Sequence, residues 1–150
     1  MLAVGDKTYV VGFLFGSDGK NIVLIEKNRP AWQAGKLNGI GGLVEKGESP
    51  DDAMVREFEE EAGAVVKNWE RVAVLQCPEA IVFFYRAFDD EAFLSLETKT
   101  DERVVMRTVS SLATAPTIPN LQWLVPLAAN PCVRLPLQLI GAGTPPEVKR

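Results

Sequence analysis

Two short apolar runs open the chain, TYVVGFLF at residues 8–15 and IVLIE at residues 22–26. Both runs are rich in β-branched and aromatic residues, which favour strands. The segment between them, GSDGKN, has the composition of a turn. The pattern therefore predicts a β-hairpin near the start of the fold.

A helical pattern follows further along the chain. Ser49 stands where a helix N-cap is expected, Pro50 suits the first helical position, and Gly63 is a natural C-terminal stop. Between them, apolar residues recur at helical spacing, at Ala53, Met54, Phe58 and Ala62. The sequence predicts a helix from Pro50 to Ala62 that packs this apolar face on a sheet.

The rest of the chain gives a coarser pattern. Residues 28–47 are irregular and rich in glycine, which predicts a loop that contains a short strand. A second helix is expected at 120–129, limited or kinked by Pro126. We expect one domain over 1–140 and a flexible tail at 141–150. Further strands are expected at 68–77, 80–88 and 103–108.

Composition narrows the classes of function. The chain has 150 residues, 47% of them hydrophobic, which is enough for a single globular domain. Its net charge of −4 argues against binding to a nucleic acid polymer, but it is compatible with a small phosphorylated ligand held by a metal. The chain contains no histidine, so proton transfer and metal binding fall to carboxylates, lysines, tyrosines or water.

The cysteines and the apolar runs bear on location. Cys77 and Cys132 form no CxxC pair, which indicates neither a disulfide framework nor a zinc site, and both are expected to be plain small apolar residues. No apolar run approaches the roughly 20 residues that span a membrane, and the first residues lack the features of a signal peptide. The sequence predicts a soluble, unprocessed, cytoplasmic protein that makes no membrane contact and is a monomer or homodimer.

The predicted helix carries the acidic run Glu57, Glu59, Glu60 and Glu61. On a helix Glu57, Glu60 and Glu61 share one face, and like charges at this spacing cost about 0.2–0.5 kcal/mol per pair. A bound divalent cation would offset this repulsion. The alternative is the solvated face of an ordinary amphipathic helix.

The spacing around this run favours the cation. Residues 42–64 read Gly42, five residues, Glu48, seven residues, and then REFEEEAGA. This segment resembles the Nudix box, Gx5Ex7REUxEExGU, in which U is an apolar residue. The resemblance implies an α/β fold of the Nudix type, with a mixed sheet sandwiched between helices and the box forming a loop-helix-loop unit.

The resemblance also implies roles for the residues of the box. The metal ligands would be the carbonyl of Gly42 and the carboxylates of Glu57, Glu60 and Glu61. Such hard oxygen ligands suit Mg²⁺, with Mn²⁺ as a substitute. Glu48 and Arg56 would form a supporting ion pair that orients these carboxylates.

The general base would be a carboxylate, either Glu60, Glu61 or a residue from another loop. Glu102, in the segment TDERVVMR, is the candidate from outside the box, because this segment resembles the SDE-type segment of the Nudix branch that hydrolyses purine triphosphates. The alternative is that Glu102 is a surface acid.

Two segments bear on the substrate. WQAGKLNGIGG, residues 32–42, resembles the WNGFGG-type approach to the box in oxidised-purine nucleoside triphosphatases, which implies that Asn38 hydrogen-bonds the base. NLQWLVPLA is similar to the helix that closes the base pocket in those enzymes, so Trp123 would lie near the base and Asn120 would take the place of an acidic pair. Each residue has a plainer interpretation: a turn residue before Gly39 for Asn38, a core residue for Trp123 and a helix N-cap for Asn120.

These interpretations lead to one expected activity with alternatives. The expected activity is metal-dependent pyrophosphohydrolysis of a nucleoside triphosphate, such as 8-oxo-dGTP or another dNTP, to a nucleoside monophosphate and pyrophosphate in nucleotide-pool sanitation. Lys27, Arg29 and Lys36 are candidates for phosphate contacts, although such side chains are more often simply solvated. The alternatives are hydrolysis of ADP-ribose, a dinucleoside polyphosphate or a nucleotide sugar, and a non-catalytic module that senses a nucleotide.

Overall fold

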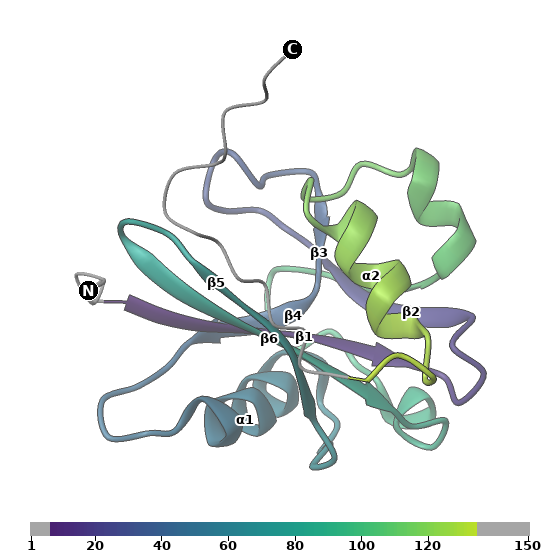
Figure 1. The fold of residues 1–150 in the computed structure, drawn as a ribbon, viewed down its shortest axis with the longest axis horizontal. Helices are drawn as coiled ribbons and strands as arrows, with labels where there is room; N and C mark the ends of the chain where they lie inside the picture. Colours follow the sequence, from purple (N-terminus) through teal and green to yellow (C-terminus); the bar gives the residue numbers. More distant parts are fainter. Residues whose placement is uncertain (1–6, 135–150) are drawn as a thin grey trace, which may run out of the picture.

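The computed structural model describes residues 7–134, so the expected domain boundary at 140 and the expected tail at 141–150 lie outside the described residues. Figure 1 shows a central sheet with one longer helix on each side. The strands are β1 (Lys7–Phe15), β2 (Asn21–Glu26), β3 (Leu37–Asn38), β4 (Ile40–Leu43), β5 (Glu70–Gln76), β6 (Ala80–Phe88) and β7 (Val104–Thr108). The α-helices are α1 (Pro50–Ala62) and α2 (Leu121–Ala129), and the 3₁₀-helices are η1 (Ala92–Ser95) and η2 (Val109–Thr114).

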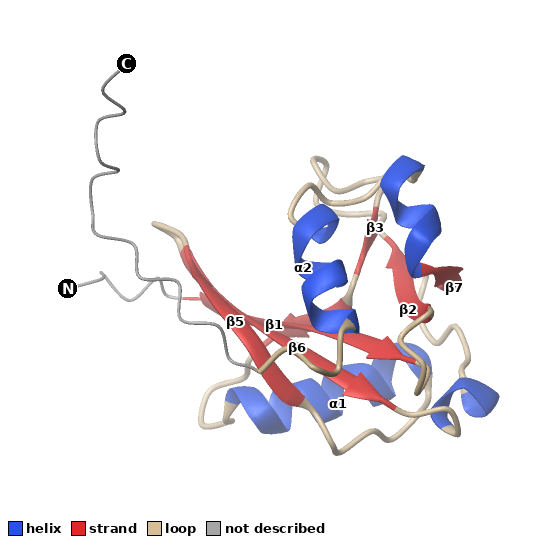
Figure 2. Ribbon diagram, turned by 45° about the vertical axis from the view of Figure 1, so that its right-hand side comes forward, coloured by secondary structure: helices blue, strands red, loops and turns tan. Residues whose placement is uncertain are grey.

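The sheet is mixed. Its strand order is β3-β2-β1-β6-β5, with β4 also paired to β1 and β7 also paired to β2. Strand β1 runs parallel to β6, whereas the other pairs are antiparallel, including the expected hairpin of β1 and β2. Figure 2 shows these strands between the blue helices. The mixed α/β architecture expected from the sequence is therefore confirmed.

The segment that leads into the box changes partner within the sheet. Asn38 pairs with Ile25 of β2, whereas Ile40 pairs with Gly12 of β1. The interpretation of Asn38 and Gly39 as a hairpin turn is wrong, because β3 and β4 pair with different strands and neither residue has a positive φ. The switch leads β4 along β1, and the box loop and α1 follow it.

Each face of the sheet buries one helix. Leu14 belongs to the core cluster beneath α1, whereas its neighbours Phe13 and Phe15 belong to the cluster beneath α2. This alternation is the period-two pattern of a strand that is covered on both sides. On the α1 side, the stripe expected from the sequence is fully buried at Ala53, Met54, Phe58 and Ala62.

The ends of α1 follow the sequence signals. The Ser49 Oγ accepts a hydrogen bond from the Asp52 N–H at 3.1 Å, and Gly63 ends the helix with φ of 77°. At α2, by contrast, Asn120 precedes the helix but makes no capping hydrogen bond with its side chain, so the expected N-cap bond is absent. Pro126 lies inside α2 rather than ending it.

The solvent exposure of Trp123 and of the two cysteines tests two further expectations. Trp123 is 48% exposed, so its interpretation as a core residue is wrong. Cys77 is half-buried, Cys132 is exposed, and both are free thiols. Within residues 7–134, no helix is long and apolar enough to cross a membrane.

Candidate active site

The acidic face of α1 lies against β4 at Gly42. A Cβ atom at Gly42 would lie 2.5 Å from the Glu57 carboxyl carbon and 2.6 Å from both carboxylate oxygens. Only the absence of a side chain at Gly42 allows this close approach, which explains the fixed glycine of the motif in physical terms. The result is a carboxylate held directly against a strand backbone.

Arg56 connects the box loop to the acidic helix. Its Nε and Nη2 donate to the two carboxylate oxygens of Glu48, at 2.7 and 2.9 Å, so the expected ion pair is present in a bidentate geometry. Its Nη1 donates to Glu57 at 2.9 Å and to Glu60 at 3.1 Å, and its Nη2 also donates to the Leu43 carbonyl at 3.1 Å. Arg56 thus offsets part of the carboxylate repulsion and fixes the orientation of Glu57.

Glu61 is left without such a partner. Its Oε2 is buried and has no hydrogen-bond partner among the described residues. Burial and the neighbouring Glu57 raise the pKa of Glu61 to about 7, although Lys27 opposes the rise. Burial also raises the pKa of Glu57, against the lowering influence of Arg56. An unpaired buried carboxylate is costly, so this oxygen points to a ligand.

The carboxylates around Glu61 are the candidates for holding a divalent cation. Within the described part of the chain, no three acidic, cysteine or histidine side chains are gathered closely enough to hold an ion as placed. Arg56 engages one oxygen of Glu57 and one of Glu60, and the Glu60 side chain is 56% exposed. The unpartnered Glu61 oxygen, the adjacent Glu57 and the backbone of Gly42 beside Glu57 nevertheless form an oxygen-rich donor set that suits Mg²⁺.

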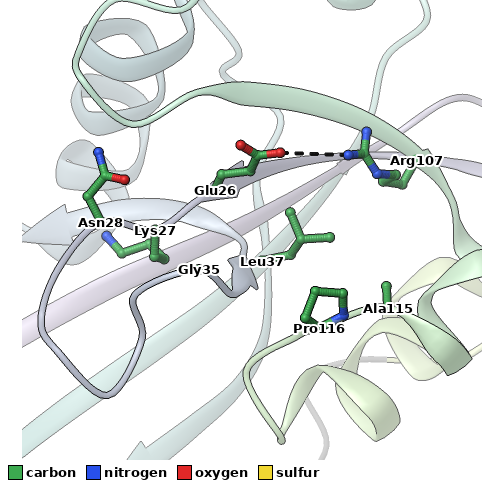
Figure 3. Close-up of a pocket in the computed structure, with 8 residues that line it drawn as sticks. All are labelled: Glu26, Lys27, Asn28, Gly35, Leu37, Arg107, Ala115 and Pro116. Carbon is green, nitrogen blue, oxygen red and sulfur yellow. Dashed lines mark ion pairs between the residues drawn. The ribbon is translucent and has the colours of Figure 1, made fainter.

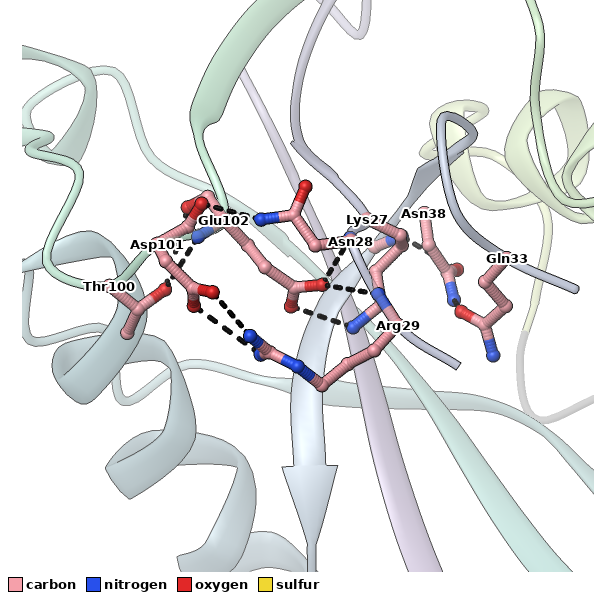
Figure 4. Close-up of polar contacts among 9 residues, drawn as sticks. Lys27, Asn28, Arg29, Gln33, Asn38, Thr100, Asp101 and Glu102 are labelled. Carbon is pink, nitrogen blue, oxygen red and sulfur yellow. Dashed lines mark hydrogen bonds and ion pairs between the residues drawn. The ribbon is translucent and has the colours of Figure 1, made fainter. Parts of the chain in front are cut away.

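Glu102 lies at the other side of the site, and it is not a surface acid. Figure 4 shows its carboxylate among donors from the end of β2. It is 4% exposed, and it accepts hydrogen bonds from the Lys27 Nζ at 2.8 Å and the Asn28 N–H at 2.6 Å. Burial alone would raise the pKa of Glu102, but these hydrogen bonds outweigh it and the pKa is lowered. The structure therefore brings Glu102 and Lys27 together, and both influence the charge of Glu61.

Arg29 and Asn38 also have partners within the chain. Arg29 forms an exposed ion pair with Asp101. The Asn38 Nδ2 donates to the Gln33 Oε1 at 3.2 Å, and the Asn38 Oδ1 accepts from the Gly39 N–H at 2.8 Å. The Asn120 Oδ1 is buried without a partner among the described residues. Sequence analysis did not single out Gln33, and no sequence signal identifies it.

A cavity of about 220 Å³ opens beside this region (Figure 3). Its lining was largely missed by sequence analysis, since only Lys27 was a candidate, and Asn38, Asn120 and Trp123 are not among its lining residues. The structure lines it with Glu26, Lys27, Asn28, Gly35, Leu37, Arg107, Ala115 and Pro116.

Comparison with known proteins agrees with this geometry. Residues 6–126 match the NUDIX domain family. The chain therefore belongs to the Nudix family, and its fold is that of solved MutT Nudix hydrolases.

Two solved structures illustrate the similarity. One is MutT from a study of Aliivibrio salmonicida and Vibrio cholerae, with a TM-score of 0.68, 25% identity, and coverage of 80% of this chain and 97% of that chain. Another is a MutT NUDIX hydrolase from Burkholderia pseudomallei, with a TM-score of 0.67 and 18% identity. The match covers 80% of this chain and 95% of that chain. The second shows similarity of fold alone.

A curated relative adds a partial match. An ADP-ribose pyrophosphatase from Haemophilus influenzae is 47% identical over 58 residues, which is 38% of this chain. The match spans 25% of the length of that enzyme.

Proposed function

We propose that this protein is a metal-dependent pyrophosphohydrolase that converts a nucleoside triphosphate to a nucleoside monophosphate and pyrophosphate. The observation that carries the proposal is the buried, unpartnered oxygen of Glu61, which lies in a carboxylate cluster with Glu57. A folded chain gains no stability from such an arrangement by itself. A bound cation would compensate the negative charge of these carboxylates.

The proposed ligands of the ion are Glu57 and Glu61, with the carbonyl of Gly42 from β4 and Glu60 at the solvent edge. When bound, Mg²⁺ supplies positive charge that neutralises phosphate oxygens and activates water for attack on phosphorus. Water adds to phosphorus, a phosphoric anhydride P–O bond breaks, and the electron pair leaves with the departing phosphate oxygen.

The chain's own residues have separate tasks in this reaction. Arg56 holds Glu57 in place through its ion pairs with Glu48 and Glu57. A carboxylate at this end of α1, Glu60 or Glu61, is proposed as the group that accepts the proton from water, because the chain contains no histidine. Both tasks depend on α1 being rigid, and Ser49 and Gly63 define its two ends.

The resemblance of residues 32–42 to oxidised-purine nucleoside triphosphatases favours the triphosphate over other Nudix substrates. It implies that the base lies near Asn38 and Asn120, which we call the base side of the site. Asn38 is held in one orientation by Gln33, and the Asn120 Oδ1 is a buried acceptor without a partner among the described residues. A base that is rich in donors and acceptors, such as 8-oxoguanine, offers complementary groups to two carboxamides. This assignment is consistent with a role in nucleotide-pool sanitation.

ADP-ribose is the second candidate. The similarity of 58 residues to an ADP-ribose pyrophosphatase favours it, although most of that enzyme lies outside the match. The same proposed metal ligands would serve either substrate, since both substrates contain a phosphoric anhydride.

The test is release of pyrophosphate and phosphate from 8-oxo-dGTP, the four dNTPs, ADP-ribose and dinucleoside polyphosphates, with Mg²⁺ or EDTA. Glu61→Gln is the test variant. Glu59→Gln is the matched control, because Glu59 is exposed on the same helix and the change in charge is identical. We expect activity that requires the metal, is lost in Glu61→Gln and is kept in Glu59→Gln. Nucleotide binding without hydrolysis of any substrate would contradict the proposal and favour a sensor.

A further inference from the structure

Glu102 joins two loops that are far apart in sequence. Its Oε1 accepts from the Lys27 Nζ at 2.8 Å. Its Oε2 accepts from the backbone N–H of Asn28 at 2.6 Å and from that of Arg29 at 3.4 Å. Glu102 itself is held in a tight turn, in which its N–H donates to the Thr100 Oγ1 at 3.2 Å. The carboxylate is therefore a buried bridge between the turn before β7 and the start of the loop after β2.

These donors require an ionised carboxylate. Each oxygen faces at least one N–H group, so neither position tolerates a donor. A carboxamide has a single acceptor oxygen, and in either orientation its NH₂ group would face the Lys27 ammonium or the Asn28 N–H. Three of about four lone-pair positions of the carboxylate are already in use. This occupancy fits an anchor better than a base that must take a proton from water.

The loop that Glu102 holds is closed on itself and contacts Asn38. At its base the Lys27 N–H donates to the Lys36 carbonyl at 2.9 Å, and the Gly35 N–H donates to the Lys27 carbonyl at 2.8 Å. Within the loop, the Gln33 Oε1 accepts from the Asn38 Nδ2. Figure 4 shows the two groups of contacts, Glu102 with the start of the loop and Gln33 with Asn38. Gln33, which contacts Asn38, therefore lies in the loop whose first residues Glu102 holds.

We propose that Glu102 is a positioning residue: it anchors loop 28–36 so that Gln33 orients Asn38 toward the substrate base, and it does not act as the general base. The inference rests on the proposed hydrolase function and adds to it the means by which the base side is positioned. It also makes Gln33 a determinant of base specificity. Arg29 and Asp101 form a second contact between the same loops, but this ion pair is exposed and contributes little.

The kinetic test compares Glu102→Gln with the neighbouring control Asp101→Asn, on the preferred nucleotide and on one with another base. For Glu102→Gln we expect KM to rise about tenfold, the preference between bases to shrink, and kcat to stay within about threefold, because a buried acceptor is lost but the reacting groups are not. Asp101→Asn should stay within about twofold in every parameter.

Two kinetic results would overturn the inference. One is a fall in kcat of about a hundredfold or more with KM and base preference unchanged, as removal of a general base predicts. The other is kinetics identical to those of the wild type. Gln33→Leu provides a second test on an accessible loop, since it cuts the link to Asn38 and leaves Glu102 intact. It should shift base preference with kcat preserved, and an unchanged preference would also contradict the inference.

Hydrogen exchange separates this inference from the proposed function. In Glu102→Gln the amides of Asn28 and Arg29, and the peptide over residues 28–36, should exchange faster than in the wild type, whereas Asp101→Asn should not change them. This measurement needs no substrate. A wild type that hydrolyses no nucleotide would refute the proposed function alone, and unchanged exchange in Glu102→Gln would refute the anchor alone.

Discussion

Replacing Glu61 by glutamine should stabilise the metal-free protein while abolishing its activity. In the folded chain, burial and Glu57 raise the pKa of Glu61 from 4.5 to about 7. The folded state therefore binds more protons than the unfolded state over this interval, so the contribution of Glu61 to stability falls as the pH rises through it. Glutamine resembles the protonated carboxyl group and does not carry this penalty.

The size of the effect follows from the pKa. The difference between the ordinary value and about 7 corresponds to about 3 kcal/mol if it is expressed in full. Glu61 keeps some contact with solvent, and its charge is coupled to that of Glu57, so we expect about 1–2 kcal/mol. Glu61→Gln should thus be more stable than the wild type by this amount at about pH 8, and nearly equal to it at about pH 4.5.

Urea denaturation in EDTA at a series of pH values measures this difference. Glu59→Gln, the exposed change on the same helix, is the control and should show less than about 0.5 kcal/mol at every pH. Adding Mg²⁺ should stabilise the wild type more than Glu61→Gln, because a ligand that binds only the folded state raises its stability. The reasoning is refuted if Glu61→Gln is no more stable than the wild type at about pH 8 in EDTA.

Three other substitutions test the supports of the site and of the fold. Gly42→Ala should lower kcat about a hundredfold in the nucleotide assay with circular dichroism unchanged, because the new Cβ displaces the Glu57 carboxylate, and full activity would contradict the close approach. Arg56→Lys loses the bidentate contact with Glu48 and should cost about 1–2 kcal/mol in urea denaturation, so wild-type stability would show that this contact is dispensable. Arg86→Met removes a buried guanidinium that donates to three carbonyls at and beyond the end of α2, and it should cost about 3 kcal/mol; a loss below about 0.5 kcal/mol would contradict this.

The helix that carries the proposed metal ligands could be predicted from the sequence because its determinants are local. Ser49, Pro50 and Gly63 specify the ends of α1, and the spacing of apolar residues specifies its buried face. Once the helix is placed, Arg56 and Glu57 follow from their positions on it. Each step uses residues only a few positions apart, where chain geometry leaves few choices.

Two interpretations are wrong where strand pairing or helix packing decided the outcome. Asn38 precedes a glycine, which locally favours a hairpin, but Asn38 pairs with β2 and Ile40 pairs with β1, so the segment changes partner instead. Trp123, by contrast, is not a core residue. The helical period in fact buries Leu121, Leu124, Val125 and Ala128, and it places Trp123 on the exposed side.

The contacts of Glu102 could not be predicted at all. The sequence identifies the acid, but its donors Lys27 and Asn28 lie 75 and 74 residues away, and the choice between surface acid, base and anchor depends on them. Asn120 is similar, because its unpartnered oxygen is visible only once the surrounding segments are placed.

The two sides of the proposed site differ in how far apart their residues lie in the sequence. The proposed metal ligands lie in one continuous segment on a strand and a rigid helix, so a change in one of them disturbs the chemistry directly. The proposed base side draws on loop 28–36, the turn that contains Glu102 and the segment before α2, which meet only in the folded state. Substitutions there can alter the shape of the base side while leaving Glu57 and Glu61 in place. Substrate preference should therefore change through loop residues such as Gln33, whereas the reaction should change only through the box.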